Sequence, residues 1–151
     1  MLRFVPALVV AVALVAAGCG NDNRSSNGYV DAVNKAQNEF AATFDKLSTQ
    51  ITSKSTPSQD RRTLDGFKSA VDKVVVQLRA IDVPSKVKAQ HQQLIDEIAS
   101  YGDEIDRARR GFASQSPQEI IRAQTRLVSA VTRVSGQINK TIDEINKRLR
   151  E

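Results

Sequence analysis

Residues 84–119 read PSKVKAQHQQLIDEIASYGDEIDRARRGFASQSPQE and contain one whole helix pattern followed by the start of another. Large or apolar side chains recur at steps of three and four, the spacing of one face of an amphipathic helix. They are Val87, His91, Leu94, Ile98, Tyr101, Ile105, Ala108 and Phe112. Proline is favoured at a first helical position. The stretch therefore predicts a helix over residues 84–114.

The end of this stretch carries a start signal for the next helix. Ser116, Pro117 and Glu119 take the N-cap, first and third positions of a full capping box. Large apolar residues then continue at helical spacing, which predicts a helix over residues 117–150. They are Ile120, Leu127, Val131, Val134, Ile138, Ile142, Ile145 and Leu149.

The same signals occur upstream. Thr56, Pro57 and Gln59 again form a helix start, and the pattern predicts a helix over residues 57–82 that ends before Pro84. A further apolar face predicts a helix over residues 29–53. The residues of these two faces are Val30, Val33, Gln37, Phe40, Phe44, Leu47 and Ile51, then Leu64, Phe67, Val71, Val74, Leu78 and Ile81.

Four amphipathic helices joined by short connections have to run antiparallel to their neighbours. The fold class expected over residues 29–151 is therefore all-α, an up-down-up-down four-helix bundle. About 120 residues suffice for one domain with one core. In this topology the two ends of the bundle lie together, and the turns near Ser55 and Ser116 lie at the opposite end.

Residues 1–18 have the layout of a secretory signal. Arg3 and the initiator amine precede an apolar run over residues 4–17 that ends in small residues. This run is shorter than the roughly 18 to 20 residues of a membrane-spanning helix. Without residues 1–18, 21 of the 22 basic side chains remain against 17 acidic ones. The remaining chain is modestly basic, which does not amount to a nucleic-acid-binding surface.

Ala16-Ala17-Gly18-Cys19 resembles the lipobox of bacterial lipoproteins, although that family usually has leucine where this chain has Ala16. The resemblance implies cleavage between Gly18 and Cys19 and a diacylglyceryl group on the Cys19 thiol. Two acyl chains anchor a protein stably to a membrane, whereas one binds only marginally. The implied location is the extracytoplasmic face of the cell membrane, with the lipid on Cys19 as the contact.

The segment that follows the lipobox is polar. Residues 20–28 read GNDNRSSNG and contain no apolar side chain. Such a composition is typical of a flexible linker. We therefore expect the lipidated cysteine and a flexible tether over residues 19–28, with the bundle starting at Tyr29.

A second resemblance lies between the second and third helix patterns. Leu78-Arg79-Ala80-Ile81-Asp82-Val83-Pro84, followed by Val87, His91 and Leu94, is similar to a recurring signature of small helical lipoproteins from high-GC Gram-positive bacteria. Many members have a second proline at the position of Val83. That group implies no assigned activity and provides no functional residues.

His91 is the only histidine and lies on an apolar helix face. With Gln37 at a similar level of the bundle, it suggests a polar core layer. One interpretation is a small site that binds a ligand or senses pH. The favoured one is a buried imidazole with satisfied hydrogen bonds that fixes the alignment of the helices. Replacing His91 with leucine would then preserve or raise stability.

The third and fourth helix patterns carry opposite charges. Counting equal distances from the turn near residue 115 predicts the ion pairs Arg126–Glu104 and Arg133–Glu97, which would align the two helices. Lys140 and Lys147 continue the seven-residue spacing of the two arginines. The alternative to ion pairing is a basic stripe for an anionic lipid or polymer.

No pattern for catalysis, metal binding or a cofactor occurs in the sequence. It lacks a Glu-x-x-His pair, a Gly-x-Ser-x-Gly elbow and a glycine-rich phosphate loop. We therefore expect no enzyme, but an interaction or structural module of the cell envelope, with an unknown envelope protein or polymer as partner and no nucleic acid. The alternative is a carrier that holds a lipid or other apolar small molecule between its helices.

Overall fold

The computed structural model describes residues 22–52, 54–114 and 116–151. Over these residues the chain forms four α-helices and one short 3-10 helix, with no strand among them. The elements are α1 (Asp22–Ser48), α2 (Pro57–Arg79), η1 (Ser85–Val87), α3 (Lys88–Phe112) and α4 (Pro117–Arg150). The signal peptide expected over residues 1–18 and the lipid site Cys19 lie outside the described residues.

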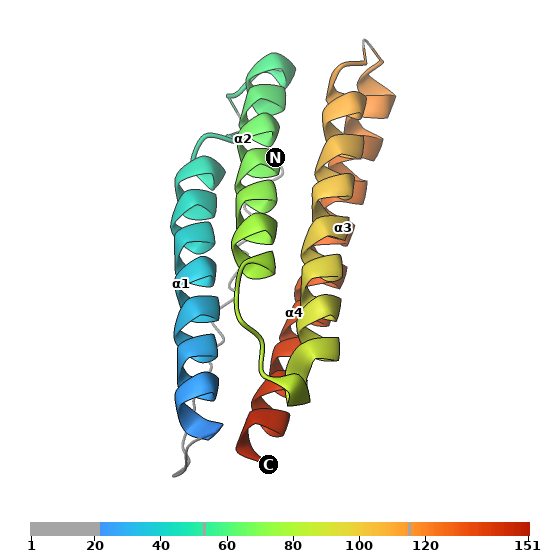
Figure 1. Cartoon of the computed structure of the whole chain (residues 1–151). Coiled ribbons are helices and arrows are strands. Elements are labelled where there is room, and N and C mark those ends of the chain that lie inside the picture. Colours follow the sequence, from blue (N-terminus) through green and yellow to red (C-terminus); the bar gives the residue numbers. More distant parts are fainter. Residues whose placement is uncertain (1–21, 53, 115) are drawn as a thin grey trace.

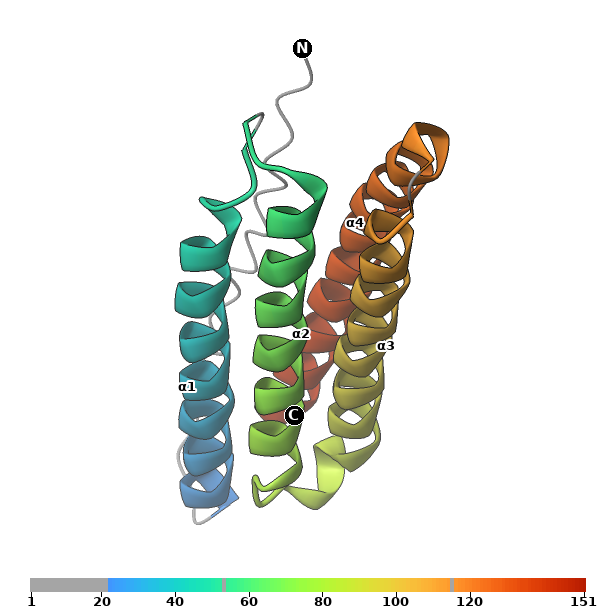
Figure 2. The same ribbon diagram turned by 90° about the horizontal axis from the view of Figure 1, so that it is seen from above.

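Consecutive helices run antiparallel, which confirms the four-helix bundle expected from the sequence (Figure 1). Helix α3 packs closely against α2 and α4, and α1 packs mainly against α2. Seen from above, α1 lies beside α2, and α4 lies beside α3 (Figure 2). The first turn of α1 and the last turn of α4 lie at the same end of the bundle (Figure 1).

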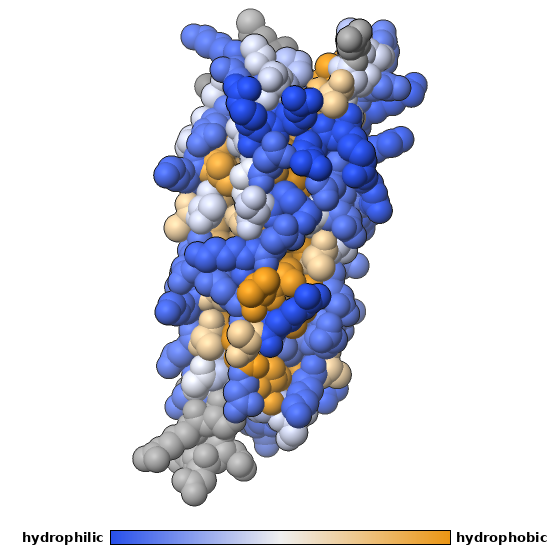
Figure 3. All heavy atoms as spheres, turned by 45° about the horizontal axis from the view of Figure 1, so that its top comes forward, coloured by the Kyte–Doolittle hydropathy of each residue, from blue (hydrophilic) through white to orange (hydrophobic). Residues whose placement is uncertain are grey.

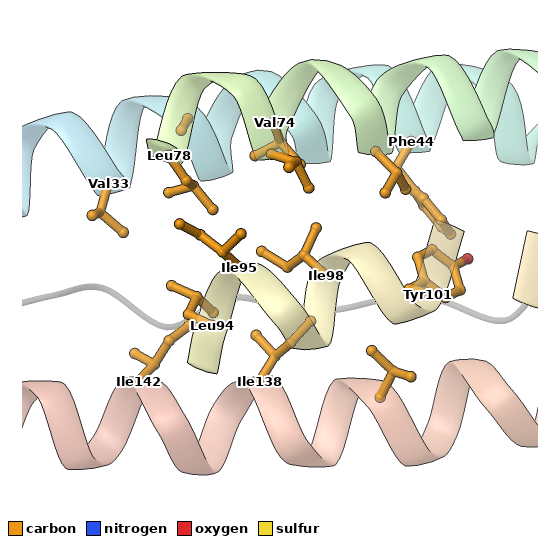
Figure 4. Packing of buried hydrophobic residues seen from close by; sticks show 14 of the residues in the cluster. Val33, Phe44, Val74, Leu78, Leu94, Ile95, Ile98, Tyr101, Ile138 and Ile142 are labelled. Atoms are coloured by element: carbon orange, nitrogen blue, oxygen red, sulfur yellow. The ribbon is translucent and has the colours of Figure 1, made fainter. Parts of the chain in front are cut away.

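Apolar side chains from all four helices fill the interior. In Figure 4, Val33, Leu78, Leu94 and Ile142 point into the same space between the helices. The largest apolar side chains that are almost fully buried are Tyr29, Leu64, Leu78, Leu94, Ile95, Ile105, Ile142 and Ile145. Burying a side chain of this size contributes about 1.5 to 3 kcal/mol. This core holds the bundle together.

Helix α1 begins earlier than the sequence pattern indicates. It starts at Asp22, so residues 22–28 are helical and do not form the flexible tether expected over residues 19–28. Ser26 and Tyr29 are both buried, with 4% and 1% of their surface exposed. Burial of Ser26 and Tyr29 favours helix here despite the weak helix propensity of asparagine, serine and glycine.

The connection between α2 and α3 is longer than predicted. Helix α2 ends at Arg79 and α3 begins at Lys88, whereas the sequence pattern placed these limits at residues 82 and 84. Pro84 has an extended backbone, with ψ at 137°, and precedes the 3-10 turn η1. Proline disfavours the helical conformation of the residue before it, so helix cannot continue through this point.

The two predicted capping boxes have different outcomes. At the start of α2, the Thr56 side chain accepts from the Gln59 N–H, and the Gln59 side chain accepts from the Thr56 N–H, as expected. At the start of α4, Ser116 makes no side-chain cap. The Glu119 carboxylate accepts instead from the hydroxyl of Ser114. The capping box predicted at the start of α4 is therefore wrong, because the Ser114 hydroxyl binds the Glu119 carboxylate.

Helices α3 and α4 approach each other closely at Gly111, near their connecting turn. A methyl group built on Gly111 would lie 2.4 Å from the Ala123 side chain and 3.9 Å from the Glu119 carbonyl oxygen. The absence of a side chain at Gly111 therefore permits this approach. By contrast, Gly136 on α4 has no atom within 4 Å of such a methyl group.

The surface is mainly polar. Hydrophilic side chains cover most of the face shown in Figure 3, and hydrophobic ones gather only in small patches. Among the described residues, the exposed large hydrophobic side chains are Val76 and Ile121. No helix in the part of the chain that the structure describes is long and apolar enough to span a membrane.

Candidate functional site

His91 lies in a buried cluster that joins three helices. Its Nδ1 atom is 3.1 Å from the Tyr29 hydroxyl oxygen, and its Nε2 atom is 3.0 Å from the Leu78 carbonyl oxygen. The rings of Tyr29 and His91 meet edge to face, with centroids 5.5 Å apart. His91 is 5% exposed and Tyr29 is 1% exposed. The cluster thus links α1, the end of α2 and the start of α3.

The partners of His91 fix its protonation state. The Leu78 carbonyl can only accept, so Nε2 carries the proton and donates it. Nδ1 is then free to accept a hydrogen bond from the Tyr29 hydroxyl. Burial lowers the pKa of His91, and the hydrogen bond to Leu78 opposes this shift. Burial also raises the pKa of the Tyr29 hydroxyl above its usual value. His91 is therefore a neutral imidazole near neutral pH.

The polar core layer contains a partner that the sequence pattern missed. Gln37, expected near His91, lines a different space between the helices. Tyr29 takes its place; it lies in the helix predicted over residues 29–53 but was not among the residues of the predicted apolar face. The spacing of four between Tyr29 and Val33 already put the tyrosine on the apolar face.

Glu97 forms a second polar cluster, between α3 and α4. Its Oε1 atom accepts from the Gln93 amide at 2.9 Å and from the Thr141 hydroxyl at 3.0 Å. Thr141 is fully buried. The predicted ion pair Arg133–Glu97 is wrong, because Arg133 binds the carboxylate of Glu104.

Arg133 pairs with Glu104 instead. The Arg133 Nη2 atom lies 2.9 Å from Glu104 Oε1, and Arg107 reaches the same oxygen at 2.8 Å. Burial by itself raises the pKa of the Glu104 carboxyl. The hydrogen bonds from Arg133 and Arg107 outweigh this effect and hold the pKa below its usual value. The predicted pair Arg126–Glu104 is wrong by seven residues along α4.

This error has a geometric cause. Side chains of an α-helix lean toward its own N-terminus. Helices α3 and α4 are antiparallel, so their side chains lean in opposite directions along the bundle. The tip of Glu104 is thus displaced away from the turn, and the tip of an arginine on α4 is displaced toward it. The two meet only when the arginine lies further along α4, as Arg133 does.

Replacing Arg133 with glutamine is expected to lower the free energy of unfolding by no more than about 1 kcal/mol, because exposed ion pairs contribute little. The loss should shrink further in 1 M salt, which screens the pair. Chemical denaturation at low and high salt measures both values. Arg126→Gln serves as the control and should have a smaller effect at low salt. An effect of Arg126→Gln equal to that of Arg133→Gln would contradict the observed pairing.

Basic side chains follow the exposed face of α4. We call Arg122, Arg126, Arg133 and Lys140 the α4 basic row; all four are exposed. Within the described residues, Arg133 alone among them has a carboxylate oxygen within 4.0 Å. The sequence contains no acidic residue over positions 120–142. Most of the row therefore keeps its charge unneutralised.

A small apolar cavity lies between the helices. Its volume is about 40 Å³, and all four helices contribute to its walls, among them Phe40, Leu94 and Ile138. By comparison, an engineered protein cavity that binds benzene has a volume of about 150 Å³. As it stands, this cavity has no room for a lipid chain.

The described residues do not assemble a metal site, since no group of three or more His, Cys, Asp or Glu side chains lies together among them. Comparisons with known protein families, with curated proteins and with solved structures found no match for this chain. A function therefore has to be inferred from its own residues.

Proposed function

We propose that this protein is an extracytoplasmic lipoprotein, held to the cell membrane by a lipid on Cys19, and that its helical bundle is a non-enzymatic interaction or structural module of the cell envelope. The observation that carries this proposal is the apolar run over residues 4–17, which ends directly before Gly18 and the lone cysteine. The order of charge, apolar run, small residues and cysteine is that of a lipoprotein signal.

The position of α1 supports a short connection to the membrane. Helix α1 begins at Asp22, so only two residues separate it from Cys19. Three extended residue steps span at most about 11 Å. A bundle anchored in this way stays close to the bilayer surface.

The state of His91 supports a non-enzymatic role. Both of its ring nitrogens are bound by protein partners, Tyr29 and Leu78. A general acid or base has to reach a substrate atom with a free nitrogen or proton. The only histidine of the chain therefore serves the packing of three helices.

Metabolic labelling with palmitate tests the anchor. We expect the wild-type chain to incorporate the label and to sediment with membranes, and the Cys19→Ala variant to do neither. Ala16→Leu is the matched control, because it introduces the residue usual in the lipobox and should keep the label. An unlabelled wild-type chain, or a label that survives Cys19→Ala, would refute the proposal.

A further inference from the structure

The α4 basic row lies within the longest acid-free stretch of the described chain. On α2 and α3, Lys68, Lys73, Arg107 and Arg109 each lie within 4.0 Å of a carboxylate oxygen. Over positions 120–142 of α4 there is no acid at all, and no longer acid-free stretch occurs in the described part of the chain. Within the row, Arg133 makes an intramolecular ion pair.

The observed alignment of α3 and α4 leaves the other cations of the row available. Equal counting from the turn would have neutralised Arg126 with Glu104, but that carboxylate is held by Arg107 and Arg133. Arg122, Arg126 and Lys140 have no ion-pair partner among the described residues. Their exposed side chains can therefore bind an anion from outside.

The shape of the row restricts the partner. Arg122 and Lys140 are 18 residues apart on one straight helix, a distance of about 27 Å. The row runs along α4, which follows the long axis of the bundle (Figure 1). A partner that contacts all of it has to extend in the same direction. A bilayer that holds the bundle by the end near Asp22 meets that end first.

The side chains of the row indicate the chemistry of the partner. Three of the four are arginines, whose planar guanidinium groups bind phosphate through two parallel hydrogen bonds. We propose that the α4 basic row binds a linear polyanion with repeated phosphate groups, located outside the membrane. This inference rests on the proposed envelope function and deepens it by naming the class of partner.

Binding of the full chain in detergent to long-chain inorganic polyphosphate tests the proposal. We expect the logarithm of the association constant to fall linearly with the logarithm of the salt concentration. The double variant Arg126→Gln, Lys140→Gln should bind more weakly, and its slope should be smaller by about 2, one for each lost phosphate contact. Both side chains are exposed and unpaired, so the fold should persist, which circular dichroism verifies.

The matched control removes the same charge from α2. The variant Arg61→Gln, Arg79→Gln also loses two exposed basic side chains, and its salt slope should remain that of the wild type. Equal losses in both variants would show attraction to net charge only and overturn the proposal. Failure of the wild type to bind at 50 mM salt would overturn it too, as would binding to vesicles of anionic lipid but not to polyphosphate.

Palmitate labelling of the same variants separates this inference from the proposed function. Polyphosphate binding that fails while Cys19 is still labelled rejects the α4 basic row alone. Loss of the label in the wild type rejects the lipoprotein proposal, whatever polyphosphate does.

Discussion

Replacing His91 with leucine is expected to lower the free energy of unfolding by about 1 to 3 kcal/mol, because the buried Tyr29 hydroxyl is left without a partner. Leucine fills part of the space but cannot accept a hydrogen bond. Loss of the His91 hydrogen bond costs less at the Leu78 carbonyl, because this carbonyl still accepts a hydrogen bond from the Ile81 N–H at 3.1 Å. The structure thus reverses the expectation from the sequence that leucine would preserve or raise stability. Denaturant unfolding followed by circular dichroism measures the change.

The double variant Tyr29→Phe, His91→Leu is the control for this explanation. It removes both polar partners, so no buried group is orphaned. We expect it to be less destabilised than the sum of the two single variants, as is usual for residues in contact. Simple additivity would show that the hydrogen bond between Tyr29 and His91 contributes nothing.

The difference in stability between the wild type and His91→Leu is expected to depend on pH. The pKa of His91 is lowered in the folded state, and in the unfolded state it lies near 6.5. Below about pH 6.5 the unfolded chain therefore binds the proton more readily, and the folded state loses stability as the pH falls. The advantage of wild type over His91→Leu should be constant above about pH 7.5 and should shrink from pH 6.5 to 5. A constant difference over this range would contradict a buried neutral imidazole.

Replacing Gly111 with alanine is the second change for which we expect a large effect. The new methyl group would lie 2.4 Å from the side chain of Ala123, whereas carbon atoms prefer about 3.5 to 4.0 Å. Helices α3 and α4 have to separate, at a cost of about 1 to 3 kcal/mol. The gain in helix propensity from glycine to alanine, about 1 kcal/mol, offsets only part of this cost. Thermal unfolding of the variant measures the net loss.

Two variants on α4 check this interpretation. Gly136→Ala makes the same chemical change where nothing lies within 4 Å, so it should stabilise the protein by about 0.5 to 1 kcal/mol. The double variant Gly111→Ala, Ala123→Gly moves the methyl group to the other helix and should be close to wild type. Destabilisation by Gly136→Ala, or no rescue by Ala123→Gly, would argue against close approach at Gly111.

The sequence predicts the bundle well because its signal is repeated many times. Steps of three and four recur through every helix, and most large residues of these faces are buried, including Leu94, Ile105 and Ile142. Helix α1 departs furthest from the predicted face. Gln37 and Phe40 of its predicted face are only half-buried, while Tyr29 and Ala36 are fully buried. The spacing of apolar residues predicts the buried face of a helix to within about one residue. Packing against the other helices decides which residues of that face are buried.

The contacts between helices could not be predicted to the same extent. The partner of His91 could not be found by counting residues from the turns, which gave Gln37 in place of Tyr29. The pairing of Glu104 depended on the lean of side chains along two antiparallel helices, which a count of residues from the turn omits. Gly111 carries no signal in the sequence that separates it from Gly136, because only the neighbouring helix distinguishes them.

Helix α1 contacts mainly α2, and its contact with His91 through Tyr29 comes within two turns of its first residue. Both ends of the described bundle lie on one side (Figure 1). A pulling force applied at Asp22 from that side acts first on the first turns of α1. The bond between Tyr29 and His91 is among the first to bear such a load, so this small buried cluster acts as the mechanical fastening of the end nearest to Cys19.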